Sequence, residues 1–406
     1  MGSIISLGVG RLEVDWGKNS FFTNHSNLFL PSDLKAAVYY YADNVRETRP
    51  AYVRRLESVT HRLELLGYTL EGCRTRFGDM ATHLELGTPP LSFDDLANVL
   101  RHVDVDRQGL PGNPDDGYDP GEYVLETILQ DPQFLKTLGA FTPQWDKWDQ
   151  GLFFENLEPY VILRLLAENP ANLTKPVIWR HMDVVENGWV AERDLFKHLV
   201  DGQRYLLVTE GSSDSHILQR SFEILKPDIA DFFYFVDMSE NYPFTGTGNI
   251  VRFCQGLAKI RIQNRVVVVL DNDAAGNAAL SRLQALGLPR NMKAIVLPSL
   301  ASFDAFPTVG PSGADVEPVN GKAVSVEMFL DLSHQTDDPA MVRWTSFDRS
   351  SGIYQGELVD KERYSNHFLT KGWRDRQYDK SKLEVLLAHI VTVASSLGES
   401  RQLEDS

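Results

Sequence analysis

The chain has 406 residues, of which 43% are hydrophobic and 24% are charged, and this composition excludes a disordered or fibrous protein. At roughly 100–200 residues per domain, the length predicts two or three domains. The 56 acidic residues outnumber the 40 lysines and arginines, so the net charge of −16 repels phosphate backbones at long range and argues against a protein that simply coats DNA.

The cysteines and the hydropathy pattern indicate the compartment. Cys73 and Cys254 are the two cysteines of the chain, too few for a disulfide scaffold and too widely spaced for a zinc site. The longest hydrophobic run, residues 36–42, is far shorter than the roughly 20 residues that span a bilayer. The N-terminus lacks the basic start and apolar stretch of a signal peptide. We therefore expect a cytoplasmic protein without membrane association.

The first part of the chain, residues 1–200, is expected to form a mixed α/β accessory domain that is mostly helical. Residues 3–9 and 11–16 read as short strands, although residues 1–6 also fit a loose N-myristoylation pattern. Residues 34–66 are expected to form a helix, because hydrophobic side chains recur there at spacings that could face a core.

Other features of this first part are weaker signals. Arg55 and His61 are loosely similar to the Arg-x4–6-His pair of HEPN ribonucleases, but such pairs also arise by chance. Residues 104–122 are rich in Asp, Gly and Pro without the ligand spacing of an EF-hand, so they read as a solvated connector. Further helices are expected at residues 122–138 and 157–169.

From residue 203 the pattern changes to alternating short strands and amphipathic helices. The almost pure valine segment 265–270 is typical of a strand that is covered on both faces. The alternation predicts an α/β fold with a parallel sheet and right-handed crossovers. The expected strands are residues 205–209, 231–236, 265–270 and 293–297, and the expected helices are residues 213–224, 249–260 and 275–286.

Two of these strands end in acidic residues. Glu210 follows the first strand and Asp214 lies in the next helical turn, whereas Asp271 and Asp273 follow the valine strand. Functional groups gather beyond the carboxyl ends of the strands in such a sheet. Side chains alternate along an extended backbone, so the two aspartates can point the same way. If the strands are neighbours, three or four carboxylates converge.

Such a group of carboxylates predicts a divalent metal site. Like charges raise one another's pKa unless a cation neutralises them. Oxygen ligands without nearby His or Cys suit Mg²⁺ or Mn²⁺ and argue against zinc. The alternative is that an aspartate at a strand end only caps the following helix.

The pattern Glu210-Gly-x-x-Asp214 followed by Asp271-x-Asp273 resembles the Toprim domain shared by topoisomerases, primases, OLD-family nucleases and RecR-type repair proteins. The resemblance covers about residues 203–332. It implies a compact Toprim sheet with a Rossmann-like parallel arrangement. It also implies that the glutamate acts in proton transfer or metal binding, and that the Asp-x-Asp pair holds metal.

Segments after the fourth strand resemble the OLD branch. Ser325 and Glu327, which follow a Pro/Ser/Gly-rich loop at residues 298–320, are similar to the second metal-binding element of OLD-type nucleases. A helix start capped by the serine is the alternative. Lys361 resembles the lysine that stabilises phosphate in those enzymes, and Lys322 is the rival candidate. A surface lysine without a catalytic role is the third interpretation.

The last part of the chain, residues 333–396, is expected to be a helical extension that completes the site, and residues 397–406 a disordered tail. Basic and aromatic side chains alternate from residue 361 to residue 382, so this segment could contact phosphates and stack on bases. A solvated helical face is the alternative. The sequence has no Gly-x4-Gly-Lys-[Ser/Thr] phosphate loop, so any ATP control would come from a separate partner chain.

The N-terminal part also carries a resemblance. Residues 2–7 and 184–190 are similar to a domain that is fused to HEPN or Toprim modules in bacterial conflict systems. The similarity spans about the first two hundred residues. It implies a bacterial protein of anti-phage defence.

These observations lead to a hypothesis and an alternative. The hypothesis is a nuclease that uses two Mg²⁺ or Mn²⁺ ions to hydrolyse DNA or RNA. Glu210, Asp271 and Asp273 would bind the first ion, while Asp214, Ser325 and Glu327 would shape the second site; Lys361 would stabilise the phosphate. The alternative is a non-catalytic Toprim scaffold, or a nucleic-acid-binding module, that recruits partner proteins. A separate ATPase or sensor partner and a homo-oligomer both remain open.

Overall fold

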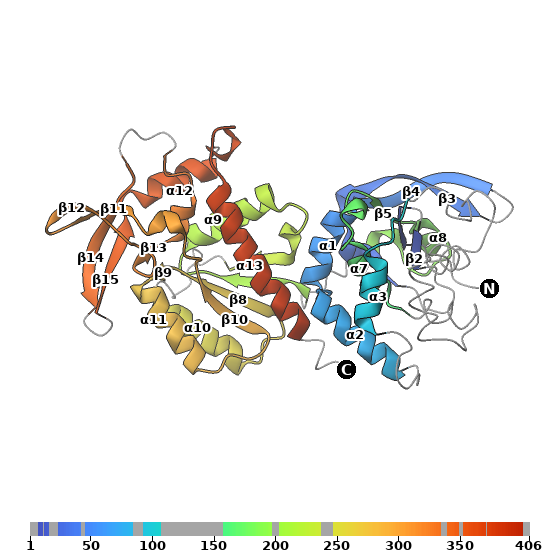
Figure 1. Cartoon of the computed structure of the whole chain (residues 1–406), viewed down its shortest axis with the longest axis horizontal. Helices are drawn as coiled ribbons and strands as arrows, with labels where there is room; N and C mark the ends of the chain where they lie inside the picture. Colours follow the sequence, from blue (N-terminus) through green and yellow to red (C-terminus); the bar gives the residue numbers. More distant parts are fainter. Residues whose placement is uncertain are drawn as a thin grey trace. The chain divides into compact units, whose positions relative to one another are not determined.

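A computed structural model describes residues 7–10, 12–15, 23–41, 45–83, 92–106, 157–196, 203–236, 247–333, 339–348, 352–370 and 372–400. The chain forms two compact units, Met1–Val200 with Gln402–Ser406, and Asp201–Arg401. Figure 1 labels the elements of each unit. The chain mixes helices with sheets, one of which is parallel, so the predicted α/β class is confirmed. The predictions for residues 1–6, for the connector beyond residue 106 and for a helix at residues 122–138 lie outside the described residues.

The first unit contains a five-stranded antiparallel sheet with the order β2-β1-β5-β4-β3. Its strands are β1 (Leu7–Val9), β2 (Leu12–Asp15), β3 (Leu34–Tyr41), β4 (Val45–Arg55) and β5 (Pro176–Trp179). Its helices include α1 (Leu56–Leu65), α2 (Leu70–His83), α3 (Phe93–Leu100), α7 (Pro159–Leu166) and α8 (Met182–Glu186). The predicted strands near the N-terminus and the predicted helix at residues 157–169 correspond to β1, β2 and α7.

The prediction of a helix at residues 34–66 is wrong over most of its length. Strands β3 and β4 form a long hairpin that pairs Leu34 with Tyr52 and Tyr41 with Val45, and α1 begins after it. The hairpin segments are rich in β-branched and aromatic residues, which favour strands. Arg55 is the N-cap of α1, and His61 lies within that helix.

The second unit is built on a parallel sheet with the order β10-β8-β6-β7. The strands are β6 (Tyr205–Val208), β7 (Phe233–Phe235), β8 (Arg265–Leu270) and β10 (Met292–Val296), joined by α9 (Ser212–Leu225), α10 (Thr247–Lys259) and α11 (Ala274–Ala285). Each of these elements lies within a few residues of its predicted position. The sheet and its crossovers were therefore readable from local patterns.

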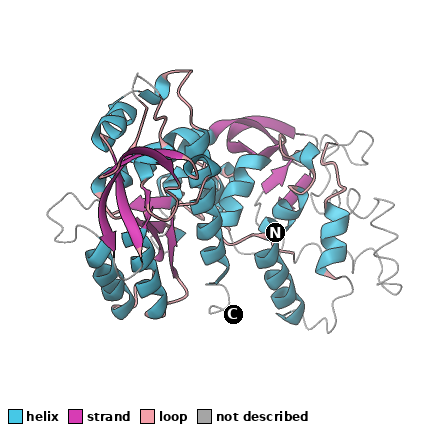
Figure 2. Cartoon of the chain, turned by 60° about the vertical axis from the view of Figure 1, so that its left-hand side comes forward, coloured by secondary structure: helices cyan, strands magenta, loops and turns pink. Residues whose placement is uncertain are grey.

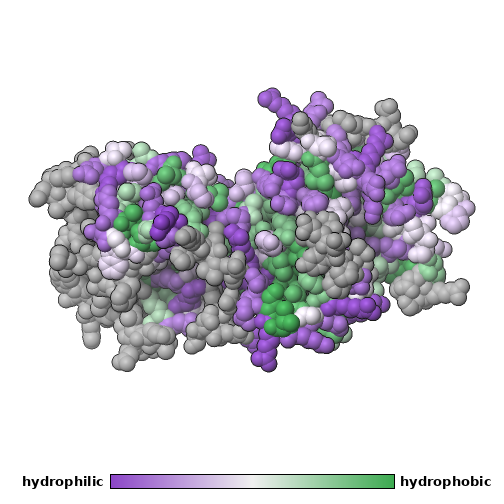
Figure 3. Space-filling view, turned by 180° about the vertical axis from the view of Figure 1, so that it is seen from behind, coloured by the Kyte–Doolittle hydropathy of each residue, from purple (hydrophilic) through white to green (hydrophobic). Residues whose placement is uncertain are grey.

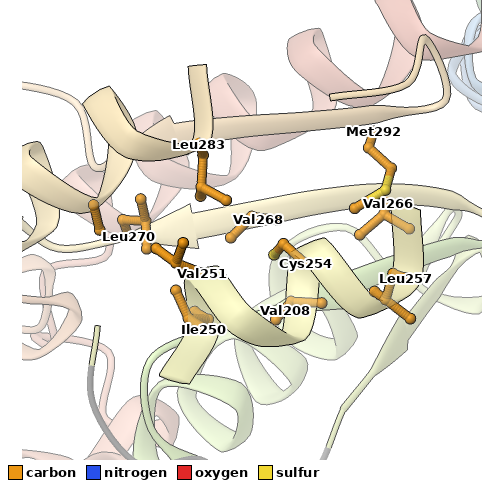
Figure 4. Packing of buried hydrophobic residues seen from close by; sticks show 11 residues of the cluster. Val208, Ile250, Val251, Cys254, Leu257, Val266, Val268, Leu270, Leu283 and Met292 are labelled. Carbon is orange, nitrogen blue, oxygen red and sulfur yellow. The ribbon is translucent and has the colours of Figure 1, made fainter. Parts of the chain in front are cut away.

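The core explains why β8 is almost pure valine. All six of its residues are buried. Val266, Val268 and Leu270 pack with residues of α10 and α11 on one face, among them Cys254 (Figure 4). The other face lies against α13 (Ser381–Ser400). Burial raises the pKa of the Cys254 thiol to about 12, and it has the same effect on Cys73 in the first unit.

Helix α13 is the one described helix that is long and apolar enough to cross a membrane. Half of its apolar window, Ser381–Gly398, is buried inside the unit. A helix of this kind is typical of the core of a globular protein. Figure 3 shows hydrophilic residues over much of one face of the molecule, with hydrophobic residues exposed in patches between them.

A second, curved sheet in this unit was not predicted. It has the order β12-β11-β14-β15 and consists of β11 (Phe306–Gly310), β12 (Gly313–Glu317), β14 (Val342–Asp348) and β15 (Ile353–Leu358) (Figures 1 and 2). The predicted loop at residues 298–320 thus contains a hairpin. The predicted helical extension begins with two strands before α12 (Lys361–Thr370) and α13. Helix α13 continues to Ser400, so residues 397–400 are helical and do not belong to a disordered tail.

Candidate acidic active site

The carboxyl ends of β6 and β8 bring the first two acidic residues together. The strands are parallel neighbours that pair Tyr205 with Arg265 and Val208 with Val268. Glu210 and Asp271 both follow directly beyond this paired region. The backbone N–H of Asp271 donates a hydrogen bond of 3.1 Å to Glu210 Oε1. The parallel register therefore brings two residues that are far apart in sequence into direct contact.

Asp214 is held at the start of α9. Its Oδ2 accepts a hydrogen bond of 2.9 Å from the N–H of Gly211. The Thr209 hydroxyl donates to the Gly211 carbonyl at 3.0 Å and lies 2.8 Å from the Ser215 hydroxyl, so the loop that carries Glu210 is tied to the helix. Asp214 is buried. A side-chain hydrogen bond with Ser213 also favours the charged form of its carboxylate.

Asp273 combines a capping role with a position beside the other acids. It is the N-cap of α11, where its Oδ1 accepts the Gly276 N–H at 2.6 Å. Its Oδ2 accepts a hydrogen bond from Gln355 Nε2, and Gln355 Oε1 in turn accepts the Ala275 N–H at 3.1 Å. The capping alternative is thus correct in part for Asp273. A cap engages one lone pair of an oxygen, so it does not remove the carboxylate as a metal ligand.

Gly276 is required by the tight turn that carries Asp271 and Asp273. A Cβ at this position would overlap the backbone oxygen of Asp271. We expect Gly276→Ala to destabilise the protein by about 2 kcal/mol, because backbone must move to relieve the overlap. Thermal or urea unfolding measures this change.

Gly256→Ala is the matched control for that substitution. Gly256 also lies in a helix, α10, but a Cβ there would have no neighbour within 4 Å. The control should be stabilised by roughly 0.5–1 kcal/mol, since alanine is the better helix former. Equal effects of both substitutions would contradict the assignment of strain to the turn.

Glu327 belongs to a short 3-10 helix, η10 (Val326–Phe329), which follows β13 (Ala323–Val324). Ser325 is the N-cap residue of this helix, but its side chain makes no capping hydrogen bond. The Ser325 hydroxyl donates to Glu327 Oε2 at 2.7 Å, and the Ser213 hydroxyl donates to Glu327 Oε1 at 3.4 Å. Glu327 is buried, with 2% of its surface exposed. The Lys382 ammonium supports this segment by donating to the Met328 carbonyl at 2.7 Å.

The electrostatics link these acids into one cluster, which we call the acidic cluster: Glu210, Asp214, Asp271, Asp273 and Glu327. Burial, together with the charges of Asp273 and Asp214, raises the pKa of Glu210 to about 7. Burial also raises the pKa of Asp214 to about 7, together with the charge of Glu327. The pKa of Asp271 is raised well above its usual range by burial and then by the four other carboxylates. The second unit thus concentrates negative charge at the end of its parallel sheet.

Of the two candidate lysines, Lys361 is the one whose charge acts on the acidic cluster. Lys361 is the first residue of α12 and lowers the pKa of both Glu210 and Asp214. Lys322 forms a bridge with Asp273 through its backbone, but its ammonium lies over the Trp344 ring, 5.9 Å from the centroid. The electrostatics therefore favour Lys361 over Lys322 as the cation that acts on the acidic cluster.

The donor set fits Mg²⁺ or Mn²⁺, because it consists of carboxylate and hydroxyl oxygens. Within the part of the chain that the structure describes, no three His, Cys, Asp or Glu side chains are placed to coordinate one ion together. Charge coupling acts over several ångströms, whereas Mg²⁺ needs oxygens at about 2.1 Å. The carboxylates therefore share one electrostatic environment, and side-chain rotation would be needed to close a coordination sphere.

The sequence analysis did not predict two hydrogen bonds to residues of the acidic cluster. Gln355 of β15 and Ser213 of α9 hydrogen bond to Asp273 and Glu327, respectively. Ser213 is a variable position of the Glu210-Gly-x-x-Asp214 pattern, and each contact joins residues more than 80 positions apart. The basic and aromatic segment at residues 361–382 also differs from its prediction, because Tyr364 and Tyr378 are buried. These two tyrosines are not available for stacking on bases.

Comparisons with known proteins bear mainly on the first unit. The model of one family, described as HEPN/Toprim N-terminal domain 1, matches residues 1–203. No curated protein and no solved structure matches the chain. The match covers half of the chain and ends where the unit with the acidic cluster begins.

Proposed function

The chain belongs to the HEPN/Toprim N-terminal domain 1 family, and from this membership together with the acidic cluster we propose that it is a metal-dependent nuclease with a Toprim core. The observation that carries the proposal is the direct contact between Glu210 and Asp271 at adjacent strand ends, with Asp214 buried beside them. The family name pairs the N-terminal domain with HEPN and Toprim modules, which supports a Toprim assignment for the unit that follows.

The proposed roles follow from the resemblance to Toprim and OLD-type nucleases and from the electrostatic coupling of the acids, whose side chains would rotate to coordinate metal. Glu210, Asp271 and Asp273 would hold one Mg²⁺ or Mn²⁺ ion, and Asp214, Ser325 and Glu327 a second. A bound pair of such ions supplies an activated water and stabilises the leaving oxygen of a phosphodiester. Glu210, with a pKa of about 7, can hold or release a proton near neutral pH.

Lys361 would act on the substrate. It is exposed at the N-terminus of α12, and its charge reaches Glu210 and Asp214. An ammonium in this position neutralises charge that develops on a scissile phosphate. The substrate is DNA or RNA, and the proposed setting is bacterial anti-phage defence in the cytoplasm. A separate ATPase or sensor chain, or self-association, would control the activity.

A scaffold that recruits partner proteins is the second candidate. The capping roles of Asp273 and Asp214 favour it, because these hydrogen bonds give both residues a structural reason to be acidic. The repulsion among the carboxylates of the acidic cluster argues against a scaffold, because it destabilises the folded chain. Helix capping explains neither why Glu327 is buried nor why the pKa of Asp271 is raised.

The test incubates the purified full chain with plasmid DNA, single-stranded DNA and transfer RNA, each with Mg²⁺, Mn²⁺ or EDTA. We expect metal-dependent cleavage of at least one substrate and its loss in the Asp271→Asn/Asp273→Asn double variant. Asp315→Asn, at an exposed acid of β12, is the control and should cleave like the parent chain. Cleavage that persists in the double variant would overturn the proposal, and so would the absence of bound Mn²⁺ in calorimetry.

A further inference from the structure

Three aromatic side chains form a continuous surface on the curved sheet of the second unit. We call Trp344, Phe347 and Tyr354 the aromatic strip. Phe347 and Tyr354 pair directly across β14 and β15, with ring centroids 4.8 Å apart. The rings of Trp344 and Tyr354 lie 6.0 Å apart. Phe347 and Tyr354 are about half exposed, at 49% and 52%.

An irregularity in the strand pairing creates this surface. Trp344 and Phe347 are three positions apart, so in a regular strand their side chains would point to opposite faces. The register shifts between Trp344 and Ser346, and the extra residue restores both rings to the face of Tyr354. The bulge leaves one residue of β14 unpaired and places the Trp344 ring on the same face as Phe347 and Tyr354.

The aromatic strip lies next to the strands that carry part of the acidic cluster. Gln355, the neighbour of Tyr354 in β15, points to the opposite face of that strand, where it hydrogen bonds to Asp273. The Lys322 carbonyl accepts the Gly356 N–H at 3.0 Å, while the Lys322 ammonium lies over the Trp344 ring. A Cβ on Gly356 would come within 2.9 Å of Trp344 and of Ala323, so glycine leaves room for both side chains at this position. One cation and one ring therefore stand directly beside the strand that carries Asp273.

We propose that the aromatic strip binds single-stranded nucleic acid by stacking on its bases, with Lys322 at a phosphate, and leads the strand to the acidic cluster. The inference rests on the proposed function, which it deepens by naming the form of the substrate. Every base has a stacking face, which a duplex hides and a single strand exposes. The aromatic strip supplies the rings on which such a base can stack. The Lys322 ammonium offsets the negative charge of the phosphate next to the acidic cluster.

The test measures binding apart from cleavage. The parent is the full chain with Asp271→Asn/Asp273→Asn, in EDTA and low salt. Its affinity for a fluorescein-labelled 12-mer of thymidine, the same length of uridine RNA and a duplex is measured by anisotropy. Phe347→Ser/Tyr354→Ser should weaken single-strand binding at least tenfold, because each stacked base contributes substantially to affinity. Duplex binding should change less than threefold.

Two controls separate stacking from a general loss of surface. Val316→Ser removes an exposed apolar side chain of β12, 61% exposed in the same sheet, and should leave binding unchanged. Phe347→Tyr/Tyr354→Phe keeps both rings and should retain single-strand binding. Equal weakening of duplex and single-strand binding overturns the inference. A change in sedimentation of the serine variant without a change in binding also overturns it, since a second copy would then be the occupant.

The outcome is distinguishable from failure of the proposed function. If the native chain cleaves nothing but the serine variant loses single-strand binding, the aromatic strip stands and the nuclease does not. If the native chain cleaves and Phe347→Ser/Tyr354→Ser, made without the two asparagine substitutions, cleaves single strands equally fast at low substrate concentration, the nuclease stands and the aromatic strip does not.

Discussion

Asp271→Asn is expected to raise the stability of the metal-free protein at pH 8 by on the order of 1 kcal/mol, because the substitution relieves like-charge repulsion within the acidic cluster. The same change should lower metal-dependent cleavage at least a hundredfold. Few single substitutions stabilise a protein and inactivate it together. This combination is the signature of a carboxylate that is kept for binding a cation.

The pH dependence of this effect has a definite sign. Glu210 and Asp214 have pKa values of about 7 in the folded chain, above the ordinary values near 4. Between about pH 4 and pH 7 the folded state binds more protons than the unfolded state, so stability falls as the pH rises through this window. Thermal unfolding in EDTA at pH 5, 6, 7 and 8 should show a steeper loss for the native chain than for Asp271→Asn.

Added Mg²⁺ or Mn²⁺ provides the complementary observation. A cation that binds the folded state raises its stability by mass action. We expect the native chain to gain melting temperature with metal at pH 8 and Asp271→Asn to gain little, while Asp315→Asn behaves like the native chain. A variant that is less stable than the native chain in EDTA at pH 8 would argue instead for a structural role of Asp271.

Lys361→Met is expected to lower kcat by about a hundredfold, the loss typical of a removed group that stabilises transition-state charge. Metal binding should persist, because the lysine is not a ligand. Lys361 also lowers the pKa of Glu210 and Asp214. Its removal should therefore move the acidic limb of the pH–rate profile to higher pH.

Lys322→Met distinguishes the role of Lys322 from that of Lys361. If Lys322 contacts phosphate along the aromatic strip, its loss raises KM and leaves kcat nearly unchanged. Lys259→Met, at an exposed residue of α10, should change neither constant. A loss of kcat in Lys322→Met together with normal kinetics in Lys361→Met would transfer the phosphate role to Lys322.

The parallel sheet could be predicted because its signals are local. The buried valines of β8 and the strand–helix alternation are visible within short windows, and the Glu210–Asp271 contact then follows from the pairing of parallel strands. The roles of the acidic residues in catalysis stay predictions. Their mutual influence on pKa is a property of the fold.

Other parts of the fold depend on contacts between residues that are far apart in the sequence, and short stretches of sequence do not reveal such contacts. Tyr39 and Val53 fit a helical spacing equally well, but β3 and β4 pair with each other, and β4 also pairs with the distant β5. The hairpin of β11 and β12 lies in a segment whose Pro and Gly content reads as loop, yet β14 completes its sheet from the later chain. Gln355 reaches Asp273 only because of that sheet.

The two buried cysteines have a practical consequence. Cys73 and Cys254 are the chain's full complement, and both thiols have pKa values of about 12. Thiolate is the form that reacts with maleimides and disulfide reagents, so neither residue competes at neutral pH. A cysteine introduced at an exposed position, such as Val316→Cys, would be the one reactive thiol. A site-specific dye or crosslinker can therefore be attached to an introduced cysteine without first replacing Cys73 and Cys254.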